Sequence, residues 1–220
     1  MQNGPFFSIP MNILSTGLKS ISLNRKLALA CSMSVFCSLG LAQVSNPVPE
    51  SPTRSGITLM LERFVTIPSS ASSAPRARIN HLKPMYDGQG TLAVNDLRGG
   101  FYIISDGEVS LYVDFDDVFP GFKDSPGLGT GFTSFAFHPE FASNGIFYTS
   151  HSENPGTGQA DFTNPVTNAP VALQGVITEW VADNPLAKVF AGTRREVMRV
   201  DIVGTIHGMQ EIAFNPNAQS

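Results

Sequence analysis

The pattern of apolar and polar residues predicts a series of short β-strands. Two apolar runs rich in aromatic residues, at 132–137 and 146–149, flank a turn-forming segment at 138–145. Pro139 cannot donate to the central ladder of a sheet, and the Asn-Gly pair that ends at Gly145 favours a positive φ. The chain is therefore expected to reverse direction between two antiparallel strands.

The first of these runs is predicted to be buried on both faces. Successive side chains of a strand alternate between the faces of its sheet, so Phe135 and Phe137 should point the same way. Ser134, Ala136 and His138 should point the opposite way. A strand with packed side chains on both faces belongs to a stack of sheets.

Further strands are predicted before this hairpin. Three of them are joined by turns rich in Asp, Asn and Gly and form a meander, which is the building unit of a propeller blade. They span residues 91–94, 100–104 and 108–115. Another strand is predicted at 57–66, with Ile57, Leu59 and Leu61 on one face. The chain is interpreted as all-β.

A short motif occurs twice. The sequence Ala-Phe-His-Pro at 136–139 returns as Ala-Phe-Asn-Pro at 213–216, each time after an apolar residue. Two copies of so short a motif are compatible with coincidence. An internal repeat of β units would instead indicate a propeller, in which every blade is one antiparallel sheet.

The first 42 residues are interpreted as a secretory signal peptide. Lys19, Arg25 and Lys26 precede an apolar run at 27–41, and Gly40 and Ala42 are small. This order is typical of a leader, with cleavage predicted after Ala42. An N-terminal membrane anchor is the alternative, but the run is shorter than the roughly 20 residues that a spanning helix needs. The protein is expected to be periplasmic or secreted, with no membrane association after cleavage.

Charge and cysteine content narrow the possible functions. The leader holds three of the 14 basic residues and none of the 18 acidic ones, so residues 43–220 carry a net charge of −7. An acidic chain without a basic run is not expected to bind nucleic acid. Both cysteines, Cys31 and Cys37, lie in the leader. The mature chain would therefore have no disulfide, cysteine-ligated zinc or catalytic thiol.

The paired motif resembles that of the glucose/sorbosone dehydrogenase family. The resemblance is carried by Phe-Ala-Phe-His-Pro-Glu-Phe at 135–141 and Asn-Gly-Ile-Phe-Tyr at 144–148. Further matches follow in two expected strands, at 178–180 and 195–201, and in the next blade motif, at 207–214, where an apolar strand is expected after His207. The resemblance implies a six-bladed β-propeller. Residues 43–56 would be a linker, and 57–220 an N-terminal portion of about two to three blades that is inactive alone.

The resemblance implies an exported quinoprotein that oxidises the anomeric hydroxyl of an aldose. Its cofactors would be pyrroloquinoline quinone, which accepts the hydride, and calcium, held by residues beyond Ser220. His207 matches the catalytic base, and a neutral imidazole can accept a proton at neutral pH. The sequence does not indicate which sugar is the substrate or which molecule accepts the electrons. Gly129 stands where the family places a glutamine that contacts the cofactor, in a Gln-x-Gly pattern.

Two alternatives remain open. A non-catalytic propeller that binds a carbohydrate or a protein is favoured by Gly129. A lactone or ester hydrolase on a similar propeller would need a set of metal-binding carboxylates, which this portion does not display.

Other polar residues are candidates for chemistry. The cluster Asp114, Asp116 and Asp117 could hold calcium but lacks the glycine and glutamate of a calcium loop, so a solvated loop is expected. His138 is interpreted as a hydrogen-bonded structural residue. His151 is expected at the rim of a blade, where it would face a ligand or cap a turn. His81, in a polar segment, has no expected partner.

Overall fold

The computed structural model describes residues 55–127 and 129–217. The predicted leader, its cleavage after Ala42 and the linker up to residue 54 lie outside these residues. The chain divides into two units, Met1–Leu59 and Met60–Ser220. Of the first unit only 55–59 are described, and they form no strand.

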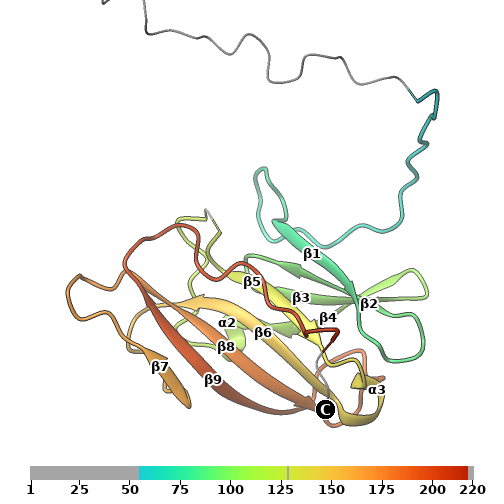
Figure 1. Ribbon diagram of the computed structural model, residues 1–220. Helices are drawn as coiled ribbons and strands as arrows, with labels where there is room; N and C mark the ends of the chain where they lie inside the picture. The colour runs from blue at the N-terminus through green and yellow to red at the C-terminus, as the bar shows by residue number, and fades with distance from the viewer. Residues whose placement is uncertain (1–54, 128, 218–220) are drawn as a thin grey trace, which may run out of the picture. The chain divides into compact units, whose positions relative to one another are not determined.

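The second unit is built from two β-sheets, which confirms the all-β prediction (Figure 1). The first sheet is a four-stranded antiparallel meander in the order β1-β2-β3-β4. Its strands are β1 (Ile79–Pro84), β2 (Leu92–Asp96), β3 (Gly100–Ser105) and β4 (Glu108–Asp114). The last three strands lie where the sequence predicted a meander, and β1 was not predicted.

The second sheet has the order β5-β6-β8-β9-β7. Its strands are β5 (Phe132–Phe137), β6 (Ile146–Glu153), β7 (Phe162–Asn164), β8 (Leu173–Ala182) and β9 (Gly192–Ile202). All neighbours are antiparallel except β7, which runs parallel to β9. Two helical turns, α2 (Phe115–Val118) and α3 (Phe141–Asn144), connect strands.

The turn between β5 and β6 forms at the predicted place. His138 N donates to Ile146 O at 3.0 Å, and α3 closes when Gly145 N donates to Phe141 O at 2.9 Å. Gly145 has φ 67, and a Cβ atom there would lie 2.4 Å from the carbonyl oxygen of Ala182. Glycine is required because the position is left-handed and touches the neighbouring β8 backbone.

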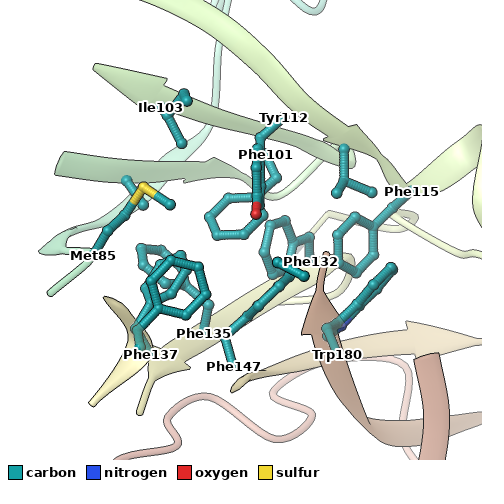
Figure 2. Close-up of a cluster of buried hydrophobic side chains, with 14 of the residues drawn as sticks. Met85, Phe101, Ile103, Tyr112, Phe115, Phe132, Phe135, Phe137, Phe147 and Trp180 are labelled. Atoms are coloured by element: carbon teal, nitrogen blue, oxygen red, sulfur yellow. The ribbon is translucent and has the colours of Figure 1, made fainter. Parts of the chain in front are cut away.

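An aromatic core joins the two sheets. Figure 2 shows Phe101 and Tyr112 of the first sheet facing Phe135 and Phe147 of the second. The rings of Phe101 and Phe135 have centroids 4.8 Å apart, and Trp180 stacks on Phe147 at 5.6 Å. Aromatic side chains bury the largest apolar areas of any residues, so this cluster supplies most of the hydrophobic stabilisation.

The predicted facing of β5 is confirmed. Phe135 and Phe137 are buried in the aromatic core. Ser134 and Ala136 are also buried, and they face the segment at 211–214 instead. All six residues of β5 are buried, as expected for a strand inside a stack.

The strand predicted at 57–66 is wrong. This segment is unpaired, and the exposed fractions of Leu59 and Leu61 are 82% and 95%. Alternating apolar residues can give a segment one apolar face, but a β-strand also needs a neighbouring strand with which to form backbone hydrogen bonds. Only its end is packed, where Val65 contacts the outer face of the first sheet beside Val94 and Tyr102.

The apolar strand predicted after His207, within 207–214, is also wrong. The segment lies on β5 without a backbone ladder. Its contact uses a side chain, since Ile212 N donates to Ser134 Oγ at 3.2 Å. It therefore covers the face of the second sheet opposite the aromatic core.

Candidate functional site

The edge of β5 is closed by polar side chains of the first sheet. β5 and β1 are the edge strands of their sheets. Asn80 Nδ2 donates to the carbonyl oxygen of Thr133 at 2.6 Å, and Lys83 Nζ donates to that of Phe135 at 2.9 Å. These carbonyl groups would otherwise be unpaired at the edge. The interactions bring β1 side chains next to the segment at 207–214.

A polar cluster of four side chains lies at this junction. Glu211 pairs with Lys83 Nζ, and its Oε2 lies 3.2 Å from His81 Nε2. Ser134 Oγ donates to Glu211 Oε1 at 3.3 Å. Partial burial opposes ionisation of Glu211, but the hydrogen bond and charge of Lys83, with His81 and Ser134, lower its pKa. No partner near His81 was expected along the sequence, and in the fold its Nε2 lies beside Glu211 but forms no hydrogen bond within the described residues.

A cleft of about 400 Å³ lies beside the polar cluster. Lys83 and Glu211 form its polar end, and apolar side chains from both copies of the repeated motif line the rest. The Phe214 ring lies 5.1 Å from that of His138 and 5.8 Å from that of Tyr148. The two motif copies are therefore neighbours in space.

The segment containing His207 meets Gly129 at the start of β5. Gln210 Nε2 donates to Gly129 O at 2.9 Å and to Gly208 O at 3.0 Å. A Cβ atom at Gly129, whose φ is +82, would lie 3.0 Å from Gln210 Nε2. The Gln210 amide thus occupies the space beside Gly129. His207 itself is exposed, with a left-handed φ of 58.

His151 lies in a buried ionic network, so its expected place at a rim was wrong. Its exposed fraction is 1%, and its Nε2 lies 2.9 Å from Glu153 Oε1. Glu153 Oε2 accepts from Arg199 Nη2 at 2.7 Å and from Thr157 Oγ1 at 2.6 Å. Arg199 also donates to Glu196 Oε2 at 2.7 Å. Sequence reasoning missed this network because Arg199 is far from Glu153 along the chain.

The environment fixes the charges of this network. Burial lowers the pKa of His151 despite the neighbouring carboxylate, so the imidazole is neutral at neutral pH. Burial opposes ionisation of Glu153, but hydrogen bonds from His151, Thr157 and Arg199 lower its pKa to about 2. The core of the network is therefore a carboxylate–guanidinium pair.

Backbone segments at Gly121 and Gly158 pack directly against the side chains of this network. A Cβ atom at Gly158 would lie 2.2 Å from Arg199 Nη2, and one at Gly121 would lie 2.2 Å from Thr157 Oγ1. The His151 ring packs against Phe119, with centroids 4.1 Å apart. The network is sealed by its neighbours, and we assign it to the stability of the second sheet.

The remaining candidates have structural roles. His138 Nδ1 accepts from Glu140 N at 3.0 Å and lies 2.8 Å from Asn144 Nδ2, which confirms the hydrogen-bonded interpretation. Asp114 caps α2 by accepting from Asp116 N at 3.1 Å. Burial and the charges of neighbouring aspartates raise the pKa of Asp116. Within 55–127 and 129–217, no three potential metal-ligating side chains gather into a site.

Comparison with known proteins identifies no relative: neither the family models nor the curated proteins match this chain. The resemblance to glucose/sorbosone dehydrogenases therefore stays a prediction. In the part of the chain that the structure describes, no helix has the length and apolar character needed to cross a membrane.

Proposed function

We propose that this chain forms successive blades of a β-propeller of the glucose/sorbosone dehydrogenase type, exported after removal of residues 1–42, and that the complete propeller oxidises an aldose. Two features support the blade arrangement. The sheets pack face to face through one aromatic core, and the second motif copy lies against the far face of the second sheet. Such stacking of antiparallel sheets is how a propeller continues from blade to blade.

One observation carries the proposal. The resemblance implies that positions 129 and 207 face a common ligand, and these positions are distant in sequence. In the fold, the 207–210 segment reaches Gly129, which Gln210 contacts at 2.9 Å. A Cβ atom at Gly208 would lie 3.9 Å from Gly129 O. We call the residues Gly129, His207, Gly208 and Gln210 the rim site.

The rim site offers partners for a sugar. The exposed His207 imidazole would accept the proton of the anomeric hydroxyl, and Gly208 would allow a ligand to approach the backbone closely. Both N–H groups of the Gln210 amide are used within the rim site, so its Oε1 and the second lone pair of the Gly129 carbonyl are the groups that can accept from neighbouring hydroxyls. Neutral partners of this kind suit an uncharged aldose.

The rim site does not fit the implied cofactors. A quinone with carboxylate groups calls for cationic partners, and calcium calls for six to eight oxygen ligands. Gly129, His207 and Gln210 supply neither of these. Pyrroloquinoline quinone and calcium would have to be held by residues outside the rim site, and we assign to the rim site only contact with the sugar and acceptance of its proton.

A non-catalytic propeller that binds carbohydrate is the second candidate. It is favoured by the absence of a side chain at Gly129 and by the cleft of about 400 Å³. Aromatic side chains at a cleft, here Tyr86 and Phe214, offer flat apolar surfaces that can pack against a sugar ring.

Titration of the complete protein with pyrroloquinoline quinone, with and without calcium, separates the two candidates. The dehydrogenase proposal expects saturable binding, followed by reduction of the bound quinone when an aldose is added. Sugar binding without quinone binding would instead assign the protein to the second candidate. The measurement is the absorbance of the quinone, with an aldose panel added after saturation.

A further inference from the structure

A second cleft, of about 360 Å³, lies among the loops before β1 and β5 and between β2 and β3. Its lining includes two basic side chains, Arg78 and Arg98, together with Asp124. The cleft is distinct from the rim site, although the loop at 124–127 leads toward Gly129. Its size exceeds that of a small inorganic ion and falls in the range of small-molecule sites.

Both guanidinium groups are held by neutral acceptors. Arg78 Nη1 donates to Asp124 O at 3.2 Å, and its Nη2 donates to Gly127 O. Arg98 Nη1 donates to Pro75 O at 3.1 Å and to Ser70 Oγ at 3.0 Å. Neither guanidinium group forms an ion pair with a carboxylate of the described residues. Each guanidinium group retains further N–H donors.

A buried carboxylate fixes the backbone beneath both arginines. Asp96 is fully buried, and its Oδ1 accepts from Arg78 N at 3.1 Å and from Arg98 N at 2.9 Å. Its other oxygen accepts from Ser70 Oγ. The Asp96 carboxylate is thus occupied by backbone and hydroxyl donors, while the two side chains extend into the cleft lining. The pair is positioned in advance of any ligand.

We propose that this cleft binds the phosphate group of a small phosphate monoester of sugar size. A single guanidinium fork satisfies the two oxygens of a carboxylate, whereas the three terminal oxygens of a phosphate monoester can accept from two guanidinium groups. The rest of the cleft would contain the organic part. The negative Asp124 carboxylate also lines the cleft, and it weakens binding of the phosphate group by electrostatic repulsion. The inference does not depend on aldose oxidation.

The test is calorimetric titration with glucose 6-phosphate, inorganic phosphate, glucuronate and glucose at constant ionic strength. We expect glucose 6-phosphate to bind more tightly than the other three. Arg98→Gln should weaken this binding on the order of tenfold or more, because a charge-assisted interaction is lost. Asp124→Asn should strengthen it several-fold, and it keeps the test valid if Arg98→Gln impairs folding. Arg195→Gln, an exposed arginine on β9, is the matched control and should change nothing.

Equal affinity of the Arg98→Gln variant and the unmodified protein would overturn the proposal. So would unchanged or weaker binding to the Asp124→Asn variant. Tighter binding of inorganic phosphate would show a free-ion site, and tighter binding of glucuronate would show a carboxylate site. Either result contradicts the phosphate monoester.

Discussion

Replacing Arg199 by methionine should destabilise the fold by about 3–5 kcal/mol, because it leaves the Glu153 carboxylate buried without its partner. Both side chains have exposed fractions of 2%, and the guanidinium group contacts Glu153 and Glu196 at 2.7 Å each. Because methionine keeps most of the side-chain volume, the loss of unfolding free energy would come from the missing charge and its hydrogen bonds and not from lost packing. With a urea m-value of about 2 kcal/mol/M, the midpoint of unfolding should fall by roughly 2 M.

The assay is urea unfolding followed by the fluorescence of the single tryptophan, Trp180, which lies in the aromatic core. Arg195→Met is the control on the same strand, since Arg195 is exposed and should contribute far less. Adding Glu153→Gln to Arg199→Met should recover part of the loss by removing the unpaired charge. A loss below about 1 kcal/mol for Arg199→Met would refute the reasoning, because it would mean that water reaches the pair.

Three further predictions concern pH, packing and exposed surface. Unfolding free energy, measured from pH 7 to pH 3, should decrease as pH falls below about 6.5, since unfolded His151 binds a proton before the folded form does. Glu153, whose pKa is lowered from 4.5 to about 2, should add a loss of about 2 kcal/mol across that interval; constant stability would contradict both assignments. Phe147→Ala should lower the unfolding free energy by about 3–5 kcal/mol and shift tryptophan emission to the red, and unchanged emission would count against the stacked ring. Replacing Leu59 and Leu61 by lysine should reduce binding of a hydrophobic dye without lowering the melting temperature, and a lower melting temperature would mean that both are packed.

Sequence patterns predicted strands in which alternate side chains differ clearly in size and polarity, because that contrast shows which face each residue occupies. The alternation in β5 identified which residues enter the aromatic core, because Phe135 and Phe137 differ sharply from Ser134 and Ala136 in size and polarity. The turn before β6 was also predictable, since Gly145 carries a local conformational signal. Both the facing of β5 and the turn before β6 depend on residues that are close together along the chain, so the sequence alone indicates them.

Features that depend on distant partners were not predictable. The alternation at 57–66 is as regular as that of a true strand, but pairing requires a neighbour that the pattern cannot indicate. His151 was expected at the rim of a blade because the strand predicted from residue 146 ended next to it. The guanidinium group that makes Glu153 suitable for burial comes from another strand. His81 lacked a visible partner for the same reason, because Glu211 reaches it only in the fold.

The central claim is that His207 at the rim site accepts a proton from an aldose. The most direct measurement is dye-coupled oxidation of an aldose panel by the complete protein, supplied with pyrroloquinoline quinone and calcium, in its unmodified form and as His207→Ala. A positioned base contributes roughly 10²–10⁴-fold to rate, so the account predicts a fall of that order, with quinone binding nearly unchanged. Equal rates for the two proteins would remove His207 from the reaction, and no oxidation by either would contradict the account.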